Sequence, residues 1–409
     1  MKLYTIITLI GAIFAVVGAS QAKTPRLNGW YPCADYTFSS GESSNSLDAE
    51  CATYKAPLCY PGICKTPQFA DPTVNIFVKR MLATEGDATT ATNLWLLQGG
   101  PGDVEASMVA LHTELKGGTN IYTMDHRGTG RSTFLDCMAA QATTTGSPNG
   151  IAIKASEVPA CAQALENEYG DLSSFSITSA ATDVVTFISK FTNGISTVVY
   201  GASYGTVLVE RIMHLNPPEV TGYVLDGVAT VSGASADKFF YTSEYDANVG
   251  EVGEYFLNLC MKVSNCSAHF KKPDTLSKTL QKVLRAFDKH PNGTCAASIS
   301  TFSSGLPNAT PSTNLRSMLS QMLMDEGLRK FIPPVVYRLN RCDKNDVDVI
   351  TQFITSLVKT FSASSQDQTF YSFLLNNLIA FSEMWETPQP PMSVMESRFN
   401  NYGMSYGTY

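Results

Sequence analysis

The chain has 409 residues, of which 44% are apolar and 16% are charged, with a formal net charge of −7. This composition excludes a disordered or fibrous chain, and the acidic balance argues against a basic face that binds nucleic acid. The five histidines do not cluster in the sequence, so few candidate metal ligands lie close together, and we expect neither a metal nor another cofactor. What remains is a globular protein with one large core or two ordinary ones.

The N-terminus has the pattern of a secretory signal peptide. Met1-Lys2 precede an apolar stretch over residues 3–17, and small residues follow up to Ala22, after which we expect cleavage. The alternative is a membrane anchor, but an apolar run of about 15 residues is short for a bilayer span of roughly 20. No later stretch reaches spanning length. We therefore expect a secreted, extracellular protein with no membrane partner.

Ten cysteines suit an oxidising compartment, in which disulfides form and persist. Zinc ligation and free core thiols are the alternatives, and the absence of any C-x-x-C pair disfavours the first. The disulfide connectivity does not follow from the sequence; the pairs Cys137–Cys161 and Cys260–Cys266 are hypotheses based only on their closeness in the chain. Three glycosylation sequons fall in one stretch and predict an exposed face: Asn265, Asn292 and Asn308.

Three regions follow the signal peptide. Residues 23–70 are rich in Cys, Ser, Gly and Pro, which predicts a cysteine-containing N-terminal segment. Residues 71–236 alternate strand and helix signals. Strands are predicted over residues 74–82, 93–97, 121–124, 196–200 and 222–225. One helix is predicted over residues 207–215. A second is predicted to end at Phe191, with Thr178 or Ser179 as its N-cap. Short apolar strands alternating with helices predict an α/β core with a mostly parallel sheet covered on both faces.

From residue 237 to 409 the strand signals almost vanish. Apolar residues recur at helical spacing over residues 255–263, 276–287, 315–323, 347–361 and 370–384. We therefore expect a helical cap and tail in this region.

Residues 201–205 read G-A-S-Y-G, a G-x-S-x-G motif centred on Ser203. A predicted strand leads into the motif and a predicted helix leads out, an order typical of a nucleophile elbow. Flanking glycines allow the close backbone approach that exposes the serine hydroxyl, and the helix N-terminus favours a developing negative charge. On this motif alone, the alternative is an ordinary β–α turn.

Two further motifs follow the predicted strands that precede the elbow. Residues 98–102 read Q-G-G-P-G, and a backbone N–H of Gly100 would form an oxyanion hole with that of Tyr204. Residues 125–132 read D-H-R-G-T-G-R-S. We interpret this second motif as a tight turn braced by a charged pair, and therefore as structural.

Taken in order, these motifs and Leu225-Asp226-Gly227 resemble the secreted α/β-hydrolase serine exopeptidases, the relatives of proline iminopeptidase and tripeptidyl aminopeptidase. The likeness covers roughly residues 30–235 well and the helical part loosely. It implies the α/β-hydrolase fold with a helical cap, and removal of residues from a free peptide N-terminus by Ser203. Gln98 departs from the family, in which a histidine often precedes G-G-P-G. Because the oxyanion donors are backbone groups, we expect this departure to be tolerated.

The resemblance also implies a cap carboxylate that holds the α-ammonium group of the substrate. Residues 382–385 read S-E-M-W, similar to the family segment that bears such an acid, which makes Glu383 the candidate. The alternative is an exposed helix carboxylate without a role. The expected partner is a peptide with a free N-terminus. The sequence leaves open the oligomeric state, the residue preference and the number of residues released.

A serine nucleophile needs a base, and in this fold the triad Asp and His follow the serine. His214 lies too far along the elbow helix, and His269 and His290 lie beside the sequons, so we expect all three away from the site. Asp226 ends a strand and would serve only as an acid. We therefore expect that the last strands of the fold, the triad Asp and the triad His are missing, which leaves the sheet with an open apolar edge.

Three hypotheses follow from this gap. The chain is a fragment or a mispredicted gene end, it is a pseudoenzyme that binds peptides without turnover, or a partner chain supplies the missing strands. Whether the protein is an active enzyme is therefore open at the level of sequence. Ester or lipid hydrolysis is the alternative chemistry, because the same elbow performs it in other proteins.

Overall fold

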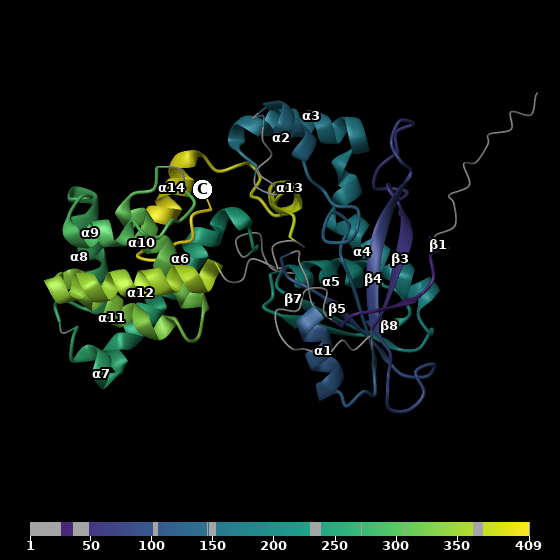
Figure 1. The fold of residues 1–409 in the computed structure, drawn as a ribbon, viewed down its shortest axis with the longest axis horizontal. Coiled ribbons are helices and arrows are strands. Elements are labelled where there is room, and N and C mark those ends of the chain that lie inside the picture. The colour runs from purple at the N-terminus through teal and green to yellow at the C-terminus, as the bar shows by residue number, and fades with distance from the viewer. Residues whose placement is uncertain are drawn as a thin grey trace, which may run out of the picture.

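The computed structural model describes residues 26–35, 49–100, 105–144, 146, 153–229, 239–270, 272–306, 308–362 and 371–408. The expected signal peptide, residues 1–22, lies outside this part of the chain, as do Pro101 and Gly102. Figure 1 shows two bodies side by side, a sheet with its covering helices and a bundle of helices. No helix in the described residues is long and apolar enough to cross a membrane.

One eight-stranded sheet organises the first body, with the order β1-β3-β4-β6-β5-β7-β8 and with β2 paired on β3. The strands are β1 (Arg26–Leu27), β2 (Tyr31–Cys33), β3 (Ala49–Pro57), β4 (Thr73–Met81), β5 (Asn93–Leu97), β6 (Asn120–Met124), β7 (Thr197–Ala202) and β8 (Val220–Asp226). β6, β5, β7 and β8 run parallel, whereas β3, β4 and β6 pair antiparallel in turn. All five predicted strands are present, and the cysteine-containing segment adds β1, β2 and β3 to the same sheet.

Helices cover both faces of this sheet. They are α1 (Glu105–Glu114), α2 (Met138–Thr144), α3 (Val158–Tyr169), α4 (Ile177–Phe191), α5 (Tyr204–Leu215) and α13 (Phe373–Glu383). The larger core lies under α4 and α5, where Trp95 stacks on Tyr122 and meets Phe187 edge-on. Met108 of α1 packs on the opposite face. The predicted α/β core, a mostly parallel sheet flanked by helices, is confirmed.

The N-cap predicted for α4 is wrong by two or three residues. Ser176 caps the helix, and its hydroxyl accepts a hydrogen bond from the Ser179 backbone N–H at 3.2 Å. Thr178 and Ser179 therefore lie inside the first turn. Serine and threonine crowd this stretch, and each is a good N-cap by itself, so composition did not select among them.

The second body is a helical bundle with a core of its own. Its helices are α6 (Tyr245–Leu259), α7 (Ser264–Ser267), α8 (Leu276–Lys289), α9 (Thr294–Ile299), α10 (Pro311–Met324), α11 (Ile332–Arg341), α12 (Lys344–Ser362) and α14 (Met392–Asn400). The residues described from 239 onward form no strand. α13 belongs to the other body, because Leu375 and Ile379 pack into the sheet core and Ser372 Oγ donates to the Leu135 carbonyl at 2.8 Å.

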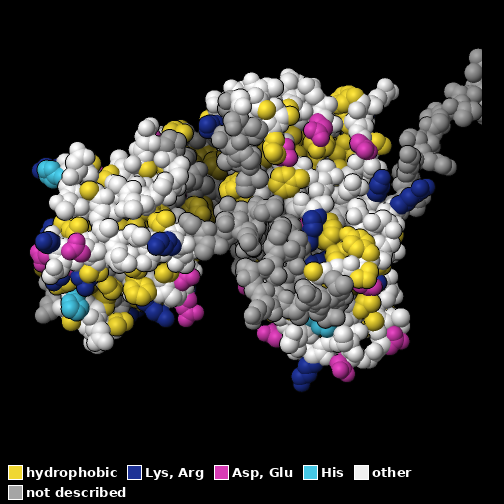
Figure 2. Space-filling model, viewed as in Figure 1, with side chains coloured by type: hydrophobic (Ala, Val, Ile, Leu, Met, Phe, Trp, Pro, Cys, Tyr) yellow, Lys and Arg dark blue, Asp and Glu magenta, His cyan; other side chains and the backbone are white. Residues whose placement is uncertain are grey.

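Disulfides tie both bodies. The pairs are Cys33–Cys51, Cys59–Cys64, Cys137–Cys161, Cys260–Cys266 and Cys295–Cys342, so every cysteine is bonded and both guessed pairs are confirmed. The three sequon asparagines, Asn265, Asn292 and Asn308, are exposed. Figure 2 shows charged side chains of both signs scattered over the visible face, without a continuous basic stripe.

Candidate active site

Ser203 lies at the turn between β7 and α5, at the carboxyl end of the parallel strands. Its φ of 51° and ψ of −118° place it in a region that residues with a side chain rarely adopt, at a cost of about 1–3 kcal/mol. Two hydrogen bonds hold this conformation. The Ser203 N–H donates to the Asp226 carbonyl at 2.8 Å, and Thr206 Oγ1 donates to the Ser203 carbonyl at 2.7 Å. Ser203 itself is exposed, as a nucleophile must be to reach a substrate.

The glycines around Ser203 are required by close backbone contacts. A Cβ at Gly205 would lie 2.0 Å from the Leu97 carbonyl oxygen, and one at Gly201 would lie 2.4 Å from the Gly205 carbonyl oxygen. A Cβ at Gly99 would lie 2.9 Å from the Cβ of Ser203. Only glycine allows such approach, so the G-x-S-x-G spacing forms a nucleophile elbow here. The chain has the α/β-hydrolase fold.

Two backbone amides beside the elbow have no partner in the described part of the chain. Tyr204 is the first residue of α5, where a helix leaves its N–H groups unpaired, and Gly100 follows β5 with a φ of 112°. Neither N–H donates to a described residue. Both N–H groups are therefore free of described acceptors, which is what the predicted oxyanion hole requires of its donors. Burial, reinforced by the nearby Glu383 charge, raises the pKa of the Tyr204 phenol and keeps it neutral.

Asp226 ends β8, and its carboxylate is already engaged. Tyr200 Oη donates to Asp226 Oδ2 at 2.6 Å, and this bond is the main reason that the pKa of Tyr200 is raised. Within the described residues β8 is the last strand on its side of the sheet, and its residues are half-buried or exposed throughout. Among the described residues no strand pairs with the outer side of β8, as expected, and Asp226 accepts a hydrogen bond from a tyrosine.

The histidines that follow Ser203 all lie away from it. His214 is exposed in the last turn of α5, with Nε2 3.9 Å from a Glu210 carboxylate oxygen, and His269 and His290 are exposed on the helical bundle. No described side chain is hydrogen bonded to the Ser203 hydroxyl, so the described residues give it no general base. They also include no group of three or more His, Cys, Asp or Glu placed to hold a metal ion.

His126 contacts the residue after Ser203, and the sequence analysis did not single it out. It follows β6, whose carboxyl end lies at the same edge of the sheet as that of β7, and its ring centroid lies 5.9 Å from that of Tyr204. It is 2% exposed, and burial lowers its pKa to about 4 despite the opposing charge of Asp125. Its position directly after a predicted strand was the available signal, whereas the chain order typical of this fold points to histidines after the serine.

Glu383 is the last residue of α13 and reaches the start of α4. Its Oε1 accepts a hydrogen bond from the Ile177 N–H at 2.9 Å, at the start of α4. Surrounding protein atoms raise the pKa of the Glu383 carboxyl, whereas the Ile177 bond and Arg211 oppose the rise. The residue keeps an exposed surface all the same. The charge of Glu383 also contributes to the raised pKa of the Tyr204 phenol.

Residues 125–132 form the expected tight turn. Asp125 Oδ2 accepts from both the backbone N–H and Nε of Arg131 at 2.8 Å. A Cβ at Gly130, where φ is 54°, would lie 2.4 Å from the same carboxylate oxygen. The predicted charged pair that braces this turn is therefore Asp125–Arg131.

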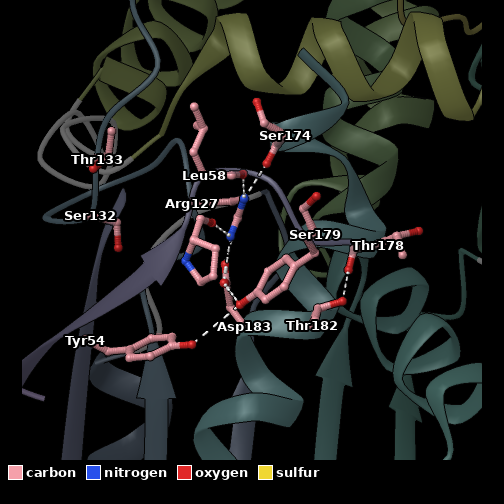
Figure 3. A network of polar contacts seen from close by, with 12 residues as sticks. Tyr54, Leu58, Arg127, Ser132, Thr133, Ser174, Thr178, Ser179, Thr182 and Asp183 are labelled. Atoms are coloured by element: carbon pink, nitrogen blue, oxygen red, sulfur yellow. Dashed lines mark hydrogen bonds and ion pairs between the residues drawn. The ribbon is translucent and has the colours of Figure 1, made fainter. Parts of the chain in front are cut away.

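A second, fully buried pair fastens this turn to α4. Arg127 Nε and Nη2 each donate to an oxygen of Asp183 at 2.7 Å (Figure 3). Arg127 Nη1 also donates to the carbonyls of Leu58 and Ser174. Tyr60 Oη donates to Asp183 Oδ1 at 2.7 Å. The network joins the β3–β4 connection, the turn after β6 and α4, and so fixes the scaffold behind the elbow.

The sequence matches no protein-family model. It also matches no curated protein. Among solved structures, it is similar to a proline iminopeptidase from Mycobacterium smegmatis, at 16% identity and a TM-score of 0.25, over 54% of this chain and 60% of that one. It is also similar to an α/β hydrolase from Novosphingobium aromaticivorans, at 15% identity and a TM-score of 0.26, over 55% and 65% of the two chains.

A third similar structure is acetyl xylan esterase 1 from Thermoanaerobacterium, at 15% identity and a TM-score of 0.28, over 57% of this chain and 61% of that one. In all three cases the match spans less than two thirds of the other chain. At these identities and TM-scores nothing about substrate is carried over. The fold assignment rests on the sheet order and the geometry of the elbow.

Proposed function

We propose that this protein is a secreted serine hydrolase of the aminopeptidase type, which cleaves residues from the free N-termini of peptides. The observation that carries the proposal is the strained, exposed Ser203 at the carboxyl end of the sheet, with Gly99 packed against its Cβ. Attack of Ser203 Oγ on a peptide carbonyl would place a negative charge on the carbonyl oxygen, which the N–H groups of Gly100 and Tyr204 would stabilise. Collapse of this intermediate would break the C–N bond, with the serine proton passing to the departing amine, and water would then hydrolyse the acyl-enzyme to release the N-terminal residues and restore Ser203.

In this proposal Glu383 selects peptides with a free N-terminus. A carboxylate near the residue after the nucleophile, with part of its surface open to solvent, provides a counter-charge for an α-ammonium group. Its bond to the Ile177 N–H fixes one oxygen and leaves the other for a ligand. The five disulfides and the three exposed sequons support the extracellular, glycosylated part of the proposal.

A second candidate function is peptide binding without turnover. It is favoured by one observation, that no described residue offers a base to Ser203, because a serine hydroxyl is a weak nucleophile until a base takes its proton. The two candidates share the binding face and differ only in the reactivity of Ser203.

Hydrolysis of a tripeptide amide separates these functions. Turnover that is lost on N-acetylation of the substrate, and lost in Ser203→Ala, supports the exopeptidase. Saturable binding of the same peptide without turnover supports the binding protein. Equal or faster turnover of a short acyl ester than of any peptide contradicts the peptidase assignment and indicates an esterase.

A further inference from the structure

His126 is held in a fixed position by its own turn. The Asp125 N–H donates to the Phe77 carbonyl at 3.0 Å, and the His126 carbonyl accepts from the backbone N–H and Oγ1 of Thr129 at 2.9 and 2.8 Å. The next residue, Arg127, is fixed by the buried network described above. The backbone therefore directs the His126 ring inward, where only 2% of the residue is exposed.

Neither ring nitrogen of His126 has a hydrogen-bond partner among the described residues. Buried polar atoms are nearly always hydrogen bonded. Burying the His126 nitrogens without a partner costs free energy that an apolar side chain of the same size would not cost. The group that faces the ring is Tyr204, with the two ring planes at 69° in a T-shaped pair. In such a pair the edge of one ring meets the face of the other, and an N–H aimed at a π face is a weak hydrogen bond.

We propose that His126 is a positioning residue of the elbow, whose neutral imidazole packs T-shaped on Tyr204 and so holds the backbone N–H that would stabilise the oxyanion. The proposal rests on the role of Tyr204 in the proposed function. Tyr204 directly follows the strained Ser203 and begins α5, so movement of its ring would displace both the donor and the nucleophile.

The contact can be measured without turnover. In imidazole NMR spectra of the disulfide-bonded full chain, the His126 signals are assigned by their loss in His126→Phe. We expect these signals to carry a ring-current shift in the unaltered protein, and Tyr204→Leu to abolish it. His214→Phe, at the far end of α5, is the matched control and should leave it unchanged. A His126 signal without this shift would overturn the proposal, and so would a shift that survives Tyr204→Leu.

The consequence for the elbow is measured by the rate at which a fluorophosphonate labels Ser203. His126→Phe should slow labelling about tenfold at saturating probe, less than the roughly 10²–10³-fold loss expected for deleting an oxyanion donor. Probe affinity and the melting curve should stay close to those of His214→Phe. Labelling at the unaltered rate would overturn the proposal. If even the unaltered protein is not labelled, the proposed hydrolase function fails, whereas the NMR measurement still decides the role of His126.

Discussion

Removal of the Asp183 carboxylate should destabilise the sheet body by about 3–5 kcal/mol, the cost of leaving one partner of a buried ion pair without its counter-charge. The side chains of Arg127 and Asp183 are 0% and 1% exposed. In Asp183→Ala the Arg127 guanidinium keeps its hydrogen bonds to the carbonyls of Leu58 and Ser174 but loses both hydrogen bonds to the carboxylate. Tyr60 Oη loses its acceptor at the same time, because the same carboxylate serves both groups.

A more exposed pair in the same sheet gives the matched control. Arg80 and Glu50 lie 2.7 Å apart, with side chains 17% and 35% exposed. Glu50→Ala should cost about 1 kcal/mol or less, since water replaces the lost partner. Replacing both buried partners, as Arg127→Met with Asp183→Leu, should cost less than Asp183→Ala alone, because no unpaired charge remains.

Urea unfolding followed by tryptophan fluorescence measures these free energies. Trp95 is buried in the sheet core and Trp30 packs against it, so the signal reports mainly on the body that contains the network. A loss below about 1 kcal/mol for Asp183→Ala would refute the reasoning. So would a double variant whose loss equals the sum of the losses measured for Arg127→Met and Asp183→Leu separately, because that result would leave no coupling between the partners.

Three further predictions concern the elbow and its surroundings. Because burial holds the folded-state pKa of His126 at about 4, below the ~6.5 of an exposed histidine, stability should fall by up to about 3 kcal/mol as pH drops from roughly 6.5 to 4. His126→Phe should remove this part of the slope in urea unfolding at several pH values, and an unchanged slope would contradict the assignment. Gly205→Ala should abolish labelling of Ser203 and lower stability by about 1–3 kcal/mol in thermal melts, since its Cβ would lie 2.0 Å from the Leu97 carbonyl oxygen. Glu383→Gln keeps an acceptor for the Ile177 N–H but removes the charge, so KM for free-N-terminal peptides should rise tenfold or more, the effect of about 1.5–3 kcal/mol from a charged hydrogen bond, while kcat for an ester stays unchanged.

The sheet and the elbow could be predicted because their signals are local. Short runs rich in apolar residues located all five predicted strands, and the glycines on both sides of Ser203 indicated a turn that only they permit. The charged pair within residues 125–132 was also local, because Asp125 and Arg131 lie six positions apart on one tight turn. Such features depend on neighbours in sequence, so one chain is enough to reveal them.

Features that depend on distant segments could not be predicted. Asp183 is the partner of Arg127 across 56 positions, and nothing local marks either residue for the other. The apolar face of α13 has the same helical spacing whether it packs on the bundle or on the sheet, and only the structure shows that Leu375 joins the sheet core. His126 reaches Tyr204 because two parallel strands end at one edge of the sheet, which is a property of topology.

The most direct test of the account is fluorophosphonate labelling of the purified, folded protein, with Ser203→Ala as the control and peptide mass spectrometry to locate the label. The hydrolase proposal predicts stoichiometric labelling at Ser203 that the substitution abolishes, and such labelling would show that a base reaches the Ser203 hydroxyl in the folded protein. A folded protein that takes up no label would contradict the hydrolase assignment and would leave the peptide-binding function in its place.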